Sequence, residues 1–183
     1  MILPRFLATD PSRFLLLLLP ALFAVAPGPL FSQPADPARP NILFVMVDDL
    51  PPDAVFTERF PFLETPNIDR LGEEGAVFDN AFVTTSLCAP SRATMLTGAY
   101  AHEHGVKSNA RNDPDPALVQ FPEVLQELGY RTALIGKWHM NPNTDPRRGF
   151  DYWLSFAHQG KYFGTPFNEN GTMIRPDDYI TDF

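Results

Sequence analysis

The sequence contains a single cysteine, Cys88, among its 183 residues. One cysteine cannot form an intrachain disulfide or a cluster of thiolate metal ligands, which excludes both as supports of the fold. Basic residues are also scarce, because 14 lysines and arginines face 22 aspartates and glutamates and give a formal charge of −8. This charge argues against a nucleic-acid partner, since affinity for phosphates depends on clustered Lys and Arg. The negative charge does not exclude an anionic substrate, because a metal ion or a few basic side chains at one site can make the local field positive.

No apolar run is long enough to span a bilayer. The run at residues 14–26 follows Arg5 and Arg13 and contains 13 residues without charge. That length suits the core of a secretory signal and falls short of the roughly 20 residues that cross a membrane. The letters AVA at 24–26 have the small-x-small pattern of a cleavage site, although Pro27 directly after it favours a later cut.

The expected domain organisation follows from this leader. Residues 1–33 are predicted to hold the signal peptide and the start of a linker, residues 34–40 the rest of the linker, and residues 41–183 one domain. The protein should therefore be secreted or periplasmic, with no stable membrane span after cleavage. An uncut N-terminal anchor is the alternative. The composition, 44% apolar and 20% charged, is that of an ordinary globular domain.

After the linker, strand and helix patterns alternate. A continuous apolar run at 41–47, ended by Asp48 and Asp49, predicts a strand that is buried on both faces. Two more strands are expected at 76–83 and 130–135. Helices are expected at 65–71, 90–96 and 122–128, each marked by an early proline or a glycine at its end. The alternation predicts an α/β fold with a parallel sheet and right-handed crossovers.

Charged residues follow two of these strands. Asp48 and Asp49 follow the first, and GKWH at 136–139 follows the third. Ligands of parallel sheets gather beyond the carboxyl ends of the strands, so these residues are candidates for one site. Lys137 and His139 stand at i and i+2, which places both on one side of an extended segment. A solvated lysine and a loop histidine are the alternatives for each residue alone.

Cys88 lies just before the predicted helix at 90–96. Free N–H groups and the positive end of the helix dipole at this place favour an anion beside Cys88. Arg92 adds a permanent cation about one helical turn further on. A small buried apolar side chain is the alternative for a lone cysteine.

Together these segments resemble the type I sulfatases, the formylglycine-dependent enzymes of the alkaline-phosphatase-like superfamily. CAPSR at 88–92 with LTG at 96–98 resembles the motif that directs oxidation of cysteine to Cα-formylglycine. Segments at 39–49, 65–71 and 129–139 resemble further family motifs in the same order. The resemblance implies an alkaline-phosphatase-like fold with a mixed, mainly parallel sheet flanked by helices.

The C-terminal part narrows the resemblance. The segments at 148–153, 161–163 and 168–171 are similar to carbohydrate sulfatases, especially the N-acetylglucosamine-6-sulfatase group. The implied reaction is hydrolysis of sulfate esters on a carbohydrate or glycosaminoglycan. Exposed aromatic residues could stack on sugar rings, with core packing as the alternative use; the candidates are Trp153, Tyr162 and Phe163.

The resemblance also implies a metal and a modified residue. Asp48, Asp49 and formylglycine at position 88 would be ligands of Ca²⁺, with Mg²⁺ as the alternative. Hydration of the formylglycine aldehyde would give two hydroxyl groups, of which one attacks the sulfur and the other later expels sulfate. A formylglycine-generating or sulfatase-maturing enzyme is therefore an implied partner, besides the sulfated carbohydrate.

Three further residues receive roles from the resemblance. Arg92 would hold the hydrated aldehyde, Lys137 would pair with sulfate oxygens, and His139 would bind the diol and assist proton transfer. His102 and His104 are interpreted as structural, and His158 as a loop residue with some chance of contacting substrate.

Similar proteins continue far beyond residue 183, so we expect this chain to be the N-terminal part of a truncated sulfatase domain. Further metal ligands are expected in the continuation, and the chain alone should bind Ca²⁺ weakly and hydrolyse little. Two alternatives remain: a phosphonate monoester or phosphodiester hydrolase of the same superfamily, and an inactive secreted fragment that binds glycans.

Overall fold

The computed structural model describes residues 39–51, 54–55, 60–110 and 112–183. The predicted signal peptide and nearly all of the linker lie outside the described residues. Among the residues that are described, no helix has the length and apolarity needed to cross a membrane. The chain divides into two compact units, Met1–Val45 and Met46–Phe183. All helices and strands of the described part, and all predicted site residues, belong to the second unit.

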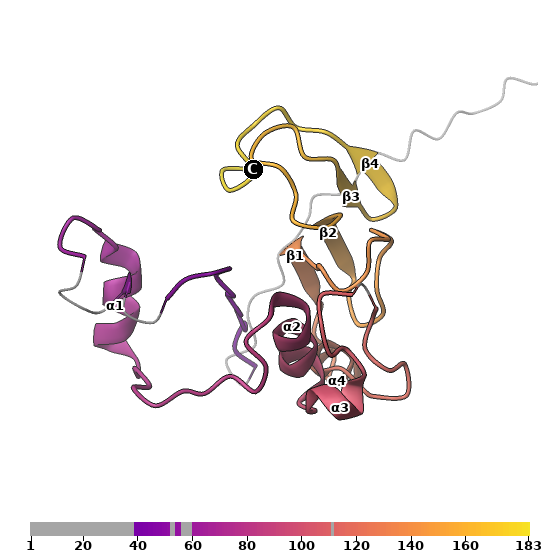
Figure 1. Ribbon diagram of the computed structural model, residues 1–183, viewed down its shortest axis with the longest axis horizontal. Coiled ribbons are helices and arrows are strands. Elements are labelled where there is room, and N and C mark those ends of the chain that lie inside the picture. Colours follow the sequence, from indigo (N-terminus) through magenta and orange to yellow (C-terminus); the bar gives the residue numbers. More distant parts are fainter. Residues whose placement is uncertain (1–38, 52–53, 56–59, 111) are drawn as a thin grey trace, which may run out of the picture. The chain divides into compact units, whose positions relative to one another are not determined.

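A four-stranded sheet forms the centre of this second unit (Figure 1). The strands β1 and β2 pair in parallel, whereas β2–β3 and β3–β4 are antiparallel. Asn170 and Gly171 connect β3 to β4 with φ of 48° and 95°, the left-handed conformation of a type I′ hairpin. The strands lie in the order in which they follow one another: β1 (Ala133–Lys137), β2 (Tyr152–Phe156), β3 (Phe167–Glu169) and β4 (Thr172–Ile174).

The helices of the described residues begin and end at local signals in the sequence. Pro66 opens α1 after Thr65, and Gly98 ends α2 in the left-handed conformation, its N–H bonded to the carbonyl of Thr94. The three helices predicted from the sequence are confirmed, with α2 beginning two residues earlier than expected. The bounds are α1 (Pro66–Glu74), α2 (Cys88–Thr97), α3 (Ala101–His104) and α4 (Phe121–Glu127).

Two of the predicted strands are wrong. The described residues form no strand at 41–47 or at 76–83. Their apolar side chains are largely exposed, for example 69% at Val45 and 90% at Phe82. An apolar run satisfies the pattern of a buried strand, but a strand exists only where a second segment pairs with it. No described segment pairs with either run, so the α/β fold with its mixed sheet is confirmed through β1–β4 alone.

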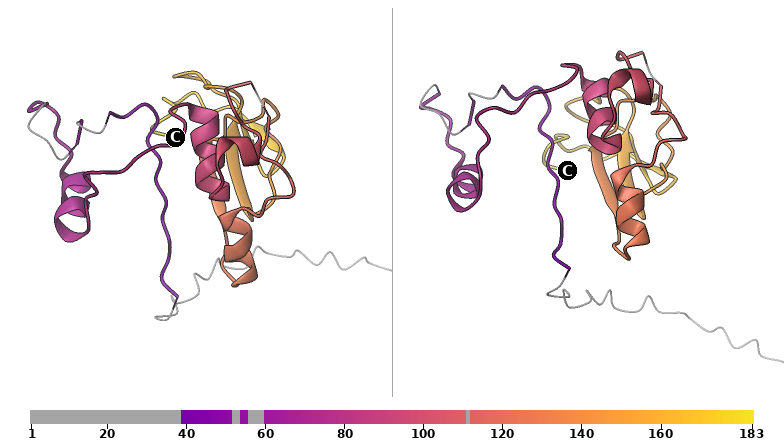
Figure 2. Two further views of the ribbon diagram at one scale, coloured as in Figure 1. Left: turned by 60° about the horizontal axis from the view of Figure 1, so that its bottom comes forward. Right: turned by 90° about the horizontal axis from the view of Figure 1, so that it is seen from below.

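The main core lies between α2 and the β1–β2 pair, which Figure 2 shows side by side. Ala89 and Ala93 of α2 pack in one cluster with Trp138, Met140 and Trp153. Their small side chains let the helix approach the aromatic rings closely. Trp153 is completely buried, so it serves packing and cannot stack on a sugar.

Candidate functional site

Cys88 is the first residue of α2, as the sequence predicted. Leu87 before it is extended and accepts the first helical hydrogen bond, from the N–H of Ser91 at 3.0 Å. The N–H of Ala89 is bound by Oδ1 of Asn109 at 3.0 Å. Cys88 is a half-buried free thiol at the start of the helix. The start of α2 therefore brings Cys88 close to the amide side chain of Asn109, which comes from a later loop.

Three predicted site residues meet in one charged cluster. Oδ1 of Asp48 accepts from Nη2 of Arg92 at 3.2 Å, and Oδ2 accepts from Nζ of Lys137 at 2.5 Å. A second guanidinium nitrogen of Arg92 donates to the main-chain carbonyl of Lys137. The side chains of Arg92 and Lys137 are only 12% and 9% exposed. Arg92 and Lys137 lie 44 and 89 residues from Asp48 in the sequence, and the Asp48 carboxylate joins them.

The cluster keeps Asp48 ionised. Burial opposes ionisation of this carboxyl, but hydrogen bonds from Lys137 and Arg92, and then their charges, outweigh it and lower the pKa of Asp48. Asp49 follows with an exposed side chain and a φ of 54°, in the left-handed region. The two predicted acids thus lie side by side in the chain, and only Asp48 has contacts within the cluster.

His139 lies two residues beyond Lys137, where the chain turns with φ of 63°. Between them, Trp138 is buried in the core. The Nδ1 atom of His139 is buried and has no hydrogen-bond partner among the described residues. This nitrogen is therefore a candidate contact for a bound molecule.

A polar cavity of about 200 Å³ opens beside His139. Its walls are formed by side chains without a carboxylate, namely three amides, two imidazoles and one proline: Asn109, Asn141, Gln159, His139, His158 and Pro142. Sequence reasoning missed Asn109, Asn141 and Gln159 because no spacing or motif connects them before the chain folds. His158, interpreted as a loop residue, lines the cavity as well.

His139 should be neutral at pH 7. Burial, followed by the positive charges of Lys137 and Arg92, lowers the pKa of His139 from its ordinary value of 6.5. We expect its imidazole signals in an NMR titration to have a midpoint below 6.5, identified by their loss in His139→Gln. A midpoint above 6.5 would contradict this description of the cluster.

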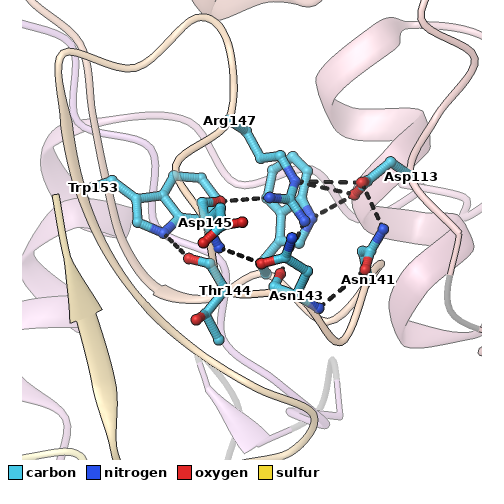
Figure 3. A network of polar contacts seen from close by, with 8 residues as sticks. Asp113, Asn141, Asn143, Thr144, Asp145, Arg147 and Trp153 are labelled. Atoms are coloured by element: carbon cyan, nitrogen blue, oxygen red, sulfur yellow. Dashed lines mark hydrogen bonds and ion pairs between the residues drawn. The ribbon is translucent and has the colours of Figure 1, made fainter. Parts of the chain in front are cut away.

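The loop that carries His139 and Asn141 is tied down by Asp113 (Figure 3). Oδ1 of Asp113 accepts from Nε1 of Trp138 at 2.8 Å, and Oδ2 accepts from Nδ2 of Asn141 at 2.9 Å. Arg147 forms an ion pair with the same carboxylate at 3.3 Å. Its guanidinium also lies 5.9 Å from the Trp138 ring and 6.0 Å from the Trp153 ring. One carboxylate therefore links the cavity wall to the aromatic core.

The same loop is ordered by its own amide side chains. Oδ1 of Asn141 accepts from the N–H of Asn143, and Oδ1 of Asn143 accepts from the N–H of Asp145. Nε1 of Trp153 donates to the carbonyl of Thr144 at 2.8 Å. These bonds fix the segment after β1 without regular secondary structure.

His104 has a structural role in this unit, as expected. It is completely buried, with Nε2 at 3.1 Å from Oγ1 of Thr94 and Nδ1 accepting from the N–H of Val106. Both ring nitrogens are thus used inside the fold. Its neighbour His102 stacks on Tyr100 and faces solvent.

The residues present fit part of a calcium site. The described part of the chain contains no group of three or more His, Cys, Asp or Glu that could hold a metal. Asp48 and Asp49 offer carboxylate oxygens, the donors that Ca²⁺ prefers, but Ca²⁺ takes about six to eight oxygen ligands. Arg92 and Lys137 already neutralise much of the Asp48 charge. Asp48 and Asp49 are therefore the carboxylates that the predicted site offers to a metal, and further oxygen ligands are needed to complete it.

The fold and the cluster define an α/β protein whose charged side chains gather at the carboxyl end of β1. The sulfatase family model matches residues 40–182 of this chain. Since the match covers most of the sequence, the chain belongs to the sulfatase family.

Similar proteins agree with this assignment. The chain is 40% identical over 177 residues to an N-acetylglucosamine-6-O-sulfatase of Bacteroides thetaiotaomicron, covering 95% of this chain and 30% of that protein. It is 34% identical over 172 residues to the N-acetylgalactosamine-6-sulfatase of Mus musculus, covering 85% and 32%. The chain thus spans about a third of the length of these relatives.

A solved structure shares the fold. It is a protein in complex with its substrate D-glucosamine-2-N,6-O-disulfate, with a TM-score of 0.70 and 39% identity. The match covers 79% of this chain and 29% of that one.

Proposed function

We propose that the complete gene product containing this chain hydrolyses sulfate esters on carbohydrates, with residue 88 as the nucleophile. The observation that carries the proposal is the meeting of Asp48, Arg92 and Lys137 beside the helix that Cys88 opens. The names of the relatives support the reaction class, and the sugar disulfate bound by a similar structure supports the substrate class.

The residues of this chain would bind and orient the sulfate group. Lys137 would neutralise sulfate oxygens as charge develops on them, and Arg92 would hold residue 88 one helical turn away. The neutral His139 would pass a proton between residue 88 and the departing groups, since its buried Nδ1 has no internal partner. The cavity beside His139 would accept the sugar ring.

Two groups absent from the unmodified chain complete the proposal. Oxidation of Cys88 to formylglycine by a maturing enzyme would supply a hydrated aldehyde with two hydroxyls, one to attack sulfur and one to expel sulfate. Asp48 and Asp49 would hold a divalent metal, most simply Ca²⁺, which supplies positive charge at the reacting oxygens. The leader at 1–33 would deliver the protein to the periplasm or the exterior.

The state of residue 88 is the sharpest test. We expect mass spectrometry of the tryptic peptide 71–92, from the native host, to show an aldehyde at position 88. The same protein should hydrolyse a sulfate ester of N-acetylglucosamine faster than a phosphodiester. A thiol at position 88 would overturn the proposed nucleophile, and a preference for the phosphodiester would overturn the proposed substrate. Binding of sulfated glycans without turnover would point to a glycan-binding protein.

A further inference from the structure

Lys137 is held between two acceptors of different charge. Its Nζ donates to Oδ2 of Asp48 and to Oε1 of Gln159, both at 2.5 Å. A lysine ammonium on a flexible stem loses side-chain entropy when it is fixed, so one contact alone leaves it several orientations. Two acceptors from separate segments restrict Nζ to one place.

The fold brings Gln159 to this place through strand pairing. In the parallel β1–β2 ladder, Lys137 at the end of β1 lies opposite Phe156 at the end of β2. Gln159 follows Phe156 by three residues, so both side chains reach the same edge of the sheet. No sequence motif signals this proximity, because it depends on the register of the two strands.

The backbone around Gln159 is fixed by an uncommon turn. His158 and Gly160 on either side have φ of 58° and 72°. A Cβ at Gly160 would lie 2.8 Å from Cδ1 of Ile180 and 2.9 Å from the ring of Phe156. Only glycine fits there without displacing these side chains, so the direction of the chain at residue 159 is set by close packing.

The neutrality of Gln159 matters for the charge of the cluster. Arg92 and Lys137 carry two positive charges, and Asp48 removes one of them. A second carboxylate at position 159 would hold Lys137 equally well but would cancel the remaining charge. An amide oxygen fixes the ammonium and leaves it able to attract an anion.

We infer that Gln159 is a positioning residue that aims Lys137 at the sulfate group while preserving the positive charge of the cluster. Gln159 also lines the cavity with His139 and His158, so it stands between the cation and the space proposed for the sugar. This inference rests on the proposed function for its kinetic consequences, and on the contacts alone for its structural ones.

Two variants separate positioning from charge. Gln159→Leu keeps the approximate size and removes the acceptor, so we expect kcat of the complete gene product to fall about tenfold, with little change in Tm. Gln159→Glu keeps the acceptor and adds a negative charge, so we expect kcat to be nearly retained and KM for the sulfated sugar to rise about tenfold. Gln126→Leu on α4 is the matched control and should change neither constant.

An NMR measurement on this chain makes the test independent of activity. The Cε signals of Lys137, assigned through Lys137→Arg, should report a rigid side chain in the original protein and in Gln159→Glu, and a mobile one in Gln159→Leu. Unchanged rigidity in Gln159→Leu would overturn the inference. Loss of rigidity in a protein inactive on sulfate esters would uphold the positioning role and overturn the proposed function. Equal kinetic constants in Gln159→Glu and the original protein would overturn the role of neutrality.

Discussion

Replacement of Cys88 by alanine is expected to lower the hydrolysis of sulfate esters by the complete gene product by roughly 10⁴-fold or more, as for nucleophile removal in other covalent enzymes. Alanine cannot be oxidised to an aldehyde, so the proposed covalent route is closed while Arg92 and Lys137 keep their contacts. Cys88 is half-buried and its thiol makes no disulfide, so the fold should persist. The measurement is kcat/KM for a sulfated N-acetylglucosamine ester.

Two further variants sharpen this result. Ser86→Ala, at an exposed position two residues before Cys88, is the control and should retain activity. Cys88→Ser supplies one hydroxyl without the second, so the sulfuryl group can be accepted but has no internal exit. We expect one equivalent of alcohol to be released and turnover then to stop. Full turnover in Cys88→Ala would refute residue 88 as the nucleophile.

Replacement of Trp153 by alanine is expected to destabilise the chain by about 3–5 kcal/mol. Trp153 is completely buried, and its Nε1 donates a hydrogen bond to the carbonyl of Thr144. The centroid of its ring lies 5.4 Å from that of Trp138 and 5.7 Å from that of Phe150. The substitution leaves a cavity and removes the partner of a loop carbonyl. Urea unfolding followed by circular dichroism measures the loss.

Phe82→Ala provides the comparison for this prediction. Phe82 is 90% exposed, so its removal should change the free energy of unfolding by no more than about 0.5 kcal/mol. Equal effects of the two substitutions would contradict the central place of Trp153 in the core.

Local chemistry explains which parts of the fold could be predicted. The helices were found because Pro66 at the start of α1 and Gly98 at the end of α2 act within a few residues. The strands at 41–47 and 76–83 were predicted wrongly because apolar periodicity describes a side-chain pattern, whereas a strand needs a partner elsewhere in the chain. The β3–β4 hairpin was not predicted, although Asn170 and Gly171 form a recognisable turn signal.

The same division applies to the candidate site. Arg92, Lys137 and His139 stood out because each lies at a fixed distance from a helix start or strand end. Gln159 could not be found, because its contact with Lys137 exists only after β1 and β2 are in register. Asn109 could not be found either, because its contact with Ala89 exists only once the loop after α3 has folded back onto the start of α2.

The Asp113 linkage gives the chain a built-in optical reporter. Both of its tryptophans touch Arg147, whose carboxylate partner also holds Asn141 in the cavity wall. Indole emission responds to nearby charge, so a molecule that pulls on Asn141 would alter fluorescence without any dye. Binding of candidate saccharides can therefore be screened without a label, by measuring the emission of the two tryptophans next to the cavity wall.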